Sequence, residues 1–143
     1  MTLSSQIRAG LGLATFFLSV IFAVPVLASD PIQITTNPGE DFAPSISPDG
    51  SFMVYVSDTS GNLDLWMKYL GVGIQPPDRR LTFHSAEDKS PAISPDGKIV
   101  AFVSHRGDPR GDIYILDLQN TNDPVAVVKG KDEDMDPAWS ADQ

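Results

Sequence analysis

The sequence predicts an all-β protein built from β-propeller blades, each a sheet of four short antiparallel strands. A seven-residue block, Pro44-Ser-Ile-Ser-Pro-Asp-Gly50, returns as Pro91-Ala-Ile-Ser-Pro-Asp-Gly97 and begins again at Pro137. The spacing is 47 and then 46 residues, a period typical of propeller blades. Short runs of β-branched and aromatic residues alternate with turn residues, and no segment shows helical periodicity.

Residues 1–28 are expected to form a secretory signal peptide that is removed. Arg8 precedes an uncharged, largely apolar stretch from Ala9 to Pro25, and Val26-Leu27-Ala28 then provides the small residues that signal peptidase recognises. The alternative is an uncleaved membrane anchor, because the 21 residues from Ala9 to Ser29 carry no charge and about 20 residues can span a bilayer. Pro25 and the Val-Leu-Ala ending favour cleavage and a periplasmic product.

Charge and cysteine content exclude several classes of partner. Residues 29–143 hold all 19 acidic residues and 9 of the 10 basic ones, a net charge of −10. That charge repels nucleic acid and anionic lipid, so we expect no nucleic-acid partner and no stable membrane anchor after cleavage; basic partners are favoured. The chain has no cysteine, which excludes a lipoprotein anchor, disulfides and thiolate metal sites.

Each repeat divides into four expected strands. In the first repeat, about 41–83, they are 44–46, 52–57, 64–70 and 80–83. In the second repeat, about 88–129, they are 91–94, 98–104, 112–118 and 125–129. The second strand of each repeat is apolar at nearly every position, which is typical of a strand covered on both faces. Blades packed between two neighbours meet this condition.

The repeats are cut at both ends of the mature region, 29–143, which is expected to be a partial propeller. Ile32–Thr35 matches a fourth strand, with Ile34, Leu81 and Val127 in equivalent positions, and 137–140 matches the first strand of a third repeat, about 134–143. Two blades cannot close a ring of roughly four to eight. We therefore expect the front of a longer protein or, alternatively, a short chain whose copies assemble into a ring.

The repeated pattern resembles the WD40-like (PD40) repeat of the TolB β-propeller family. It combines a Pro-x-x-Ser-Pro-Asp-Gly turn, an apolar strand ending in Ser, and an Asp-Leu-Trp or Asp-Ile-Tyr strand; eight of fourteen positions agree between 44–57 and 91–104. The resemblance implies a six-bladed, non-catalytic periplasmic propeller that binds envelope proteins, such as Tol-type or peptidoglycan-associated partners. The α/β domain that precedes the propeller in TolB has no counterpart between Ala28 and the first strand, so its partner-binding segment is not carried over.

The repeated turn is interpreted as structural. Proline fixes φ at the second turn position, aspartate bonds the backbone and glycine accepts the left-handed conformation that follows. These residues are Pro48, Asp49 and Gly50 in the first repeat and Pro95, Asp96 and Gly97 in the second.

Three acidic residues, Asp41, Asp88 and Asp134, form the candidate interaction site. Each stands three residues before the proline of its repeat. Because repeats place equivalent residues around one rim, these carboxylates are expected to anchor their loops and to line the mouth of a central channel.

We expect no catalytic residues, no cofactor and no metal site. The Gly-x-Ser-x-Gly elbow of serine hydrolases is absent, the acidic loop 132–136 lacks the spacing of a calcium loop, and His84 and His105 have no companions at metal-ligand spacing. The alternative function is the N-terminal propeller of a prolyl-oligopeptidase-like serine peptidase whose catalytic domain lies outside this chain. Trp66, Tyr114 and Trp139 are expected to pack between blades.

Overall fold

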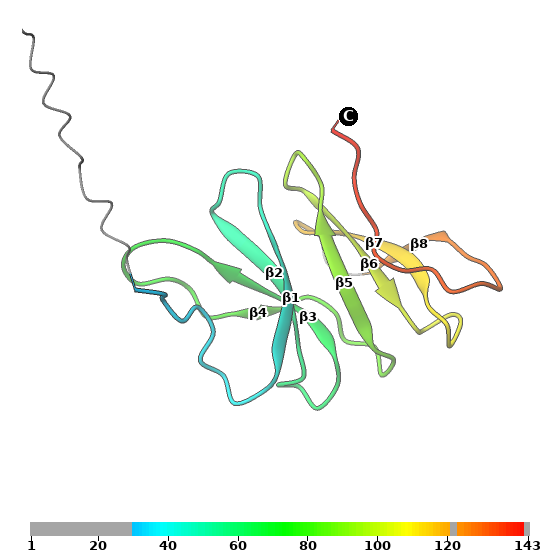
Figure 1. Cartoon of the computed structure of the whole chain (residues 1–143), viewed down its shortest axis with the longest axis horizontal. Helices are drawn as coiled ribbons and strands as arrows, with labels where there is room; N and C mark the ends of the chain where they lie inside the picture. The colour runs from blue at the N-terminus through cyan, green and yellow to red at the C-terminus, as the bar shows by residue number, and fades with distance from the viewer. Residues whose placement is uncertain (1–29, 121–122, 142–143) are drawn as a thin grey trace, which may run out of the picture. The chain divides into compact units, whose positions relative to one another are not determined.

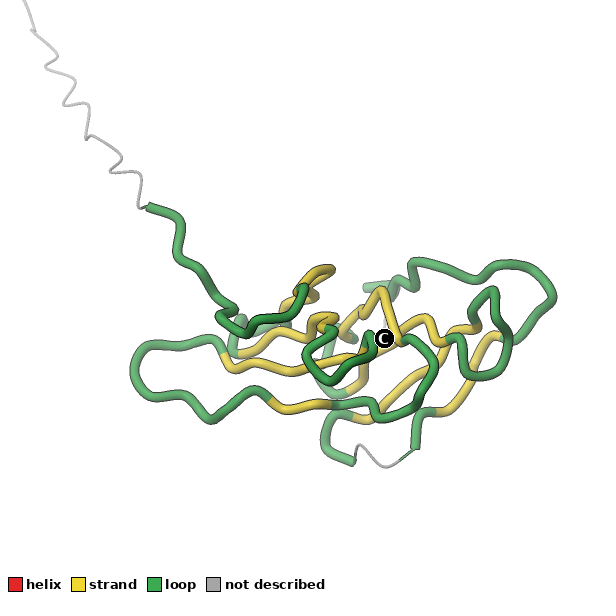
Figure 2. The backbone as a smooth tube through the Cα atoms, turned by 90° about the horizontal axis from the view of Figure 1, so that it is seen from below, coloured by secondary structure: helices red, strands yellow, loops and turns green. Residues whose placement is uncertain are grey.

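The structure, a computed structural model, describes residues 30–120 and 123–141, so the expected signal peptide lies outside the described residues. Eight strands form two antiparallel sheets of four, each in sequence order (Figure 1). The strands are β1 (Asp41–Ile46), β2 (Phe52–Ser57), β3 (Asp64–Tyr69), β4 (Arg79–Arg80), β5 (Asp88–Ile93), β6 (Ile99–Ser104), β7 (Asp112–Asp117) and β8 (Val125–Val128). These ranges contain strands and loops without helix (Figure 2), and hence no helix that could cross a membrane. The predicted all-β fold of four-stranded blades is confirmed.

The Ser-Pro-Asp-Gly turns close the first hairpin of each sheet through side-chain hydrogen bonds. The carboxylate of Asp49 accepts from the Ser47 hydroxyl at 2.7 Å and from the Ser51 N–H at 3.0 Å, and these bonds lower its pKa to about 2. Gly50 donates its N–H to the Ser47 carbonyl at 2.8 Å and has a φ of 71°, and Gly97 repeats this conformation at 73°. Only glycine adopts such angles without steric strain.

We expect Gly50→Ala to lower the free energy of unfolding by roughly 1–2 kcal/mol, the cost of forcing an L-residue into the left-handed region. The added Cβ meets no atom within 4 Å, so backbone conformation is the sole source of the effect. Urea denaturation measures it, with Lys98→Ala, an exposed change beside the second turn, as the control. Equal stability of the two variants would contradict the assigned role of the glycine.

Central strands β2 and β6 are buried along nearly their whole length, as their continuous apolar sequences predict. Alternate side chains of these strands point into a single core, which lies between the two sheets. The first sheet contributes Val54, Val56, Leu65, Met67 and Leu81, and the second contributes Val100, Phe102, Tyr114, Leu116 and Leu118. The two sheets therefore pack face to face, as consecutive blades of a propeller do.

Hydrogen bonds join the two sheets at opposite edges. The Ile93 N–H on β5 donates to the Ser45 hydroxyl on β1 at 3.0 Å. The Arg79 guanidinium on β4 donates to the Leu118 carbonyl at 2.9 Å. At one edge β1 therefore lies beside β5, and at the other edge β4 lies beside the end of β7.

Several predicted strand boundaries are wrong. The first strands begin at Asp41 and Asp88 rather than at the prolines, because pairing with the second strands continues beyond a bulge that precedes each proline. The fourth strand of the first sheet is only Arg79–Arg80 rather than 80–83. There the Thr82 hydroxyl, instead of a backbone carbonyl, accepts from the Leu65 N–H at 3.0 Å, and the ladder ends.

The bulges repeat in backbone conformation. Ala43, Ser90 and Asp136 have φ values of 48°, 49° and 48°, although none of them is glycine. Such values are uncommon for these residue types and mark a bend. Their spacing follows the sequence repeat, so the third repeat has the local geometry of a first strand even where no ladder forms.

The two predicted orphan strands, Ile32–Thr35 and 137–140, are not strands in the structure. A strand needs a neighbour that completes its hydrogen bonds, and the described residues provide none at either segment. The C-terminal segment still lies beside β5 (Figure 1), where the Trp139 indole donates to the Ala92 carbonyl at 2.8 Å. The Ser90 hydroxyl also donates to Asp136 at 3.2 Å.

The predicted equivalence of Leu81 with Val127 is wrong by one residue. Val128 pairs with Ile113, and the register shifts so that Val127 is the extra residue of a bulge in β8. Leu81 bonds the corresponding residue of the first sheet, Leu65, at 2.8 Å. Val128 is therefore the structural counterpart of Leu81.

Candidate interaction surface

Asp88, the middle residue of the predicted acidic rim, is fully buried. Its two carboxylate oxygens lie 2.8 and 3.1 Å from the Arg106 guanidinium, which also bonds the Ser104 hydroxyl at 2.8 Å and lies over the ring of Tyr114 at 5.0 Å. The carboxylate is thus neutralised inside the protein. It holds the start of β5 and is closed to an outside partner.

Asp41 and Asp134 are half-buried and lack an arginine partner among the described residues. Asp41 accepts a hydrogen bond from the Asn37 side chain at 3.0 Å. One carboxylate oxygen of Asp134 is buried without a hydrogen-bond partner in the described part of the chain. The rim role stays a prediction, and these two carboxylates are the ones that could serve it.

Each sheet has a second apolar face, turned away from the shared core. On the first sheet this open face consists of Met53 and Tyr55 from β2 with Trp66 and Lys68 from β3; on the second sheet it consists of Ala101, Ile113, Ile115, Val125, Val127 and Val128. We call these two surfaces the first open face and the second open face. Alternation along the strands places them opposite the core residues.

Met53, Tyr55, Ala101 and Ile113, in the middle of the open faces, are buried, and the faces are exposed at their edges. Ile34, which stays 46% exposed, lines a hollow on the first open face together with Phe42, Met53 and Tyr55. Trp139 lines a hollow on the second open face with Ile113, Ile115 and Val128. These are the positions at which a fourth strand and a first strand of neighbouring blades were predicted.

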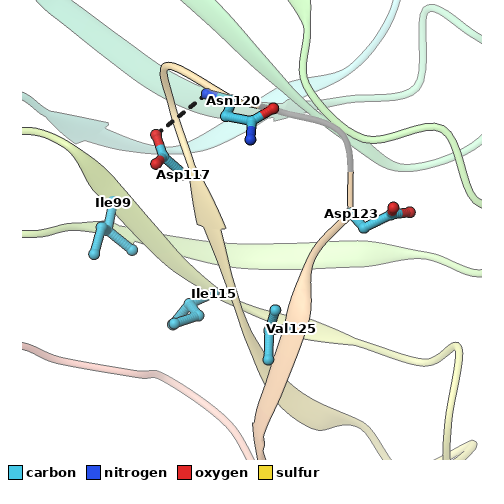
Figure 3. Close-up of a pocket in the computed structure, with 6 residues that line it drawn as sticks. All are labelled: Ile99, Ile115, Asp117, Asn120, Asp123 and Val125. Carbon is cyan, nitrogen blue, oxygen red and sulfur yellow. Dashed lines mark hydrogen bonds between the residues drawn. The ribbon is translucent and has the colours of Figure 1, made fainter.

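A shallow pocket continues the second open face toward the β7–β8 connection (Figure 3). Its floor is Ile99, Ile115 and Val125, and its rim carries Asp117, Asn120 and Asp123. Asp117 accepts from the Asn120 N–H at 3.2 Å. We call Asp117 and Asp123 the acidic margin of the second open face. An apolar surface with an acidic margin is suited to contact with a protein surface that has a basic edge.

The model of the TolB beta propeller domain family matches residues 18–143. The chain belongs to this family. Similar solved structures include a protein assigned as TolB from Agrobacterium tumefaciens, with 24% identity and a TM-score of 0.53 over 64% of this chain. They also include TolB from Acinetobacter baumannii, with 24% identity and a TM-score of 0.51 over 62% of this chain. At this identity they show the fold. No curated protein matches the sequence.

This TolB-family chain spans only part of its structural relatives, 34% of the Agrobacterium protein and 21% of the Acinetobacter protein. The family match and the packing of the two sheets both indicate that the sheets are consecutive propeller blades. The family resemblance predicted from the repeated turn and strand motifs is confirmed.

Other residues singled out from the TolB-family sequence lie as follows. His84 is exposed, and half-buried His105 lies 3.3 Å from the Glu87 carbonyl. Within the described ranges no three His, Asp or Glu side chains gather closely enough to hold a metal ion, the acidic loop 132–136 included. Trp66 and Trp139 are half-buried on the open faces, whereas Tyr114 lies in the core between the sheets.

A polar network lies at the outer end of the first open face. Asp78 accepts from the Tyr55 hydroxyl at 2.9 Å and pairs with Lys68 at 2.8 Å. Burial, followed by the hydrogen bond to Asp78, raises the pKa of Tyr55 above its usual value of 10. The neutral phenol is therefore favoured in the folded state.

Alkaline pH is expected to destabilise the protein through Tyr55. Because the folded pKa is raised, the contribution is complete below the unfolded pKa of about 10 and declines as the pH rises above it. Urea denaturation at a series of pH values measures the effect. Tyr55→Phe should flatten the decline between pH 10 and 11; an unchanged slope in this variant would assign the alkaline loss to other groups.

The open faces were missed as sites by sequence reasoning. The signal was present in the continuous apolar strands 52–57 and 99–104, which require cover on both faces. The sequence does not indicate which face of each sheet packs against the other sheet. The structure shows it, because the core residues lie on one face of each sheet.

Proposed function

We propose that this chain is an exported, non-catalytic propeller segment that serves as a docking platform for other proteins of the cell envelope. Membership of the TolB beta propeller family over residues 18–143 carries the proposal. The apolar open faces and the acidic margin support it, since both favour contact with protein. The partner classes follow from the family: Tol-type or peptidoglycan-associated envelope proteins.

Export to the periplasm is part of the proposal. The uncharged stretch from Ala9 to Pro25 and the ending Val26-Leu27-Ala28 support a cleaved signal peptide. Intact-mass measurement and N-terminal sequencing of the protein purified from its own cell envelope test this. A chain that starts at Ser29 is the expected result, and a retained Met1 would favour the membrane-anchor alternative.

Docking is tested by capture of partners from envelope extracts after chemical crosslinking, with identification by mass spectrometry. Asp41→Ala and Asp134→Ala should reduce capture of a defined envelope protein, because they remove half-buried rim carboxylates. Asp132→Ala, which removes one exposed negative charge outside the acidic margin, is the matched control. Circular dichroism confirms that each variant is folded.

Two outcomes would contradict the proposal. Capture of no envelope protein would remove the platform role, and equal capture by all variants would remove the rim from it. Labelling of the native protein by a serine-directed fluorophosphonate would instead support the peptidase alternative.

A further inference from the structure

A groove lined by aromatic, proline and arginine residues lies along the β4 edge of the first sheet. Its walls include Tyr69 at the end of β3, Pro76 and Pro77 from the β3–β4 loop, and Arg79 and Phe83 from β4 and the residues after it. We call this hollow the edge groove. Tyr69 is 39% exposed and Phe83 is 68% exposed. Aromatic side chains and arginine are enriched at the centres of protein interfaces, so the edge groove has the composition of a contact surface.

The β3–β4 loop, residues 70–78, adds exposed aliphatic side chains to this region. It extends beyond the strands that it connects (Figure 1), and its Val72 and Ile74 are fully exposed. The corresponding residues of the second repeat, 118–124, are Leu-Gln-Asn-Thr-Asn-Asp-Pro, with no aliphatic side chain after Leu118. The first repeat therefore differs from the second in having an apolar loop beside the edge groove.

The blade fold does not require the residues of the edge groove. The second sheet has Asp117 and Val125 at the positions that Tyr69 and Arg79 occupy in the first sheet. Aspartate and valine are thus compatible with the same four-stranded blade. The aromatic ring and the guanidinium are additions of the first repeat, and a role in binding accounts for them.

The walls of the edge groove are held in place by ion pairs. Asp78, which also lines the groove, pairs with Lys68 at 2.8 Å. Arg80 pairs with buried Asp64 at 2.7 Å and lies over the ring of Phe83, 4.9 Å from its centroid. A surface that is already ordered loses little conformational entropy when a ligand binds.

The charge of the edge groove differs from that of the protein as a whole. Residues 65–86 carry three basic side chains and one acidic side chain, whereas residues 29–143 have a net charge of −10. Exposed Arg79 donates to the Leu118 carbonyl at 2.9 Å and has no carboxylate partner in the described ranges. Charges more than about 8 Å away are largely screened at physiological ionic strength, so the local positive charge decides which ligand is attracted. A carboxylate is the group that a guanidinium binds best.

We propose that the edge groove binds an extended segment of a partner protein that carries apolar side chains next to an aspartate or glutamate. The apolar side chains contact Tyr69 and Phe83, and the carboxylate pairs with Arg79. Grooves lined by aromatic residues bind extended peptides in this way. The edge groove is separate from the acidic rim, which favours basic partners. The proposal therefore adds a second class of partner and does not rest on the docking role of the rim.

Selection of short random peptides displayed on phage against the purified protein tests the proposal. The enriched peptides are expected to combine apolar residues with aspartate or glutamate. Phe83→Ser and Arg79→Gln should each weaken the binding of the synthesised peptides by about tenfold, as measured by fluorescence polarisation. Met135→Ser and Lys98→Gln change one exposed apolar and one exposed basic side chain elsewhere. These matched controls should bind like the wild type.

Two further measurements keep the test decisive. Circular dichroism shows whether each variant is folded, which matters because Arg79 also bonds across the sheets. If Arg79→Gln does not fold, the wild type still provides the test of charge, since its affinity for the peptides should fall as salt is added.

Several results would overturn the proposal. These are the absence of enriched peptides, the enrichment of basic peptides, and equal binding by groove variants and controls. Binding of the protein to phosphatidylglycerol vesicles without binding of any selected peptide would also overturn it, because Val72 and Ile74 would then contact a membrane surface.

Discussion

Replacing Arg106 with alanine is expected to lower the free energy of unfolding by about 3–5 kcal/mol. The carboxylate of Asp88 is fully buried, and Arg106 is its cationic partner at 2.8 Å. Removal of the guanidinium leaves a buried charge without compensation and also removes the contact with the Tyr114 ring. Thermal and urea denaturation of the purified protein measure the loss.

The double variant Arg106→Ala/Asp88→Ala separates charge burial from packing. If the uncompensated carboxylate dominates, the double variant should be more stable than Arg106→Ala alone. Arg110→Ala is the control, because Arg110 pairs with Asp108 at the exposed surface and should change stability little. A small effect of Arg106→Ala would show that Asp88 does not need this partner.

Leu81→Ala is expected to destabilise the protein by about 2–5 kcal/mol, the range for a leucine removed from a packed core. Leu81 is 1% exposed and lies between the two sheets. Val128→Ala removes an aliphatic side chain at the equivalent position of the second sheet, which is 45% exposed, and should have a much smaller effect. Urea denaturation of both variants measures the difference. Equal effects of the two would mean that the second open face is covered as thoroughly as the core.

Repeat period and strand composition were sufficient to predict the fold class. The paired Ser-Pro-Asp-Gly turns mark where the first hairpin of each repeat turns, and the structure confirms four strands in each of the two repeats. Strand ends were predicted less well, because bulges at Ala43 and Ser90 let pairing extend upstream of the prolines. The hydrogen bond from the Leu65 N–H to the Thr82 hydroxyl ends the pairing of β3 with β4 early, so β4 is shorter than predicted. Neither the bulges nor this bond has a local sequence signature.

Much of the candidate site depends on long-range packing. Asp41, Asp88 and Asp134 are equivalent in sequence, yet in the described part of the chain only Asp88 is paired with an arginine, Arg106, 18 residues further along the chain. The repeat predicted a common anchoring role and could not indicate which carboxylate is buried. The position of the open faces likewise depends on which face of each sheet packs into the shared core. That packing is determined by contacts between side chains far apart in the sequence.

Amide hydrogen exchange of Ile93, followed by NMR, tests the central claim that the two sheets are consecutive blades packed face to face. The Ile93 N–H has its bond across the interface, to the Ser45 hydroxyl, whereas the amides within β6 and β7 are bonded inside one sheet. Slow exchange at Ile93 that becomes faster in Ser45→Ala, with β6 and β7 unchanged, is the result we predict. Fast exchange at Ile93 in the wild type, with β6 and β7 protected, would contradict the packing of the blades.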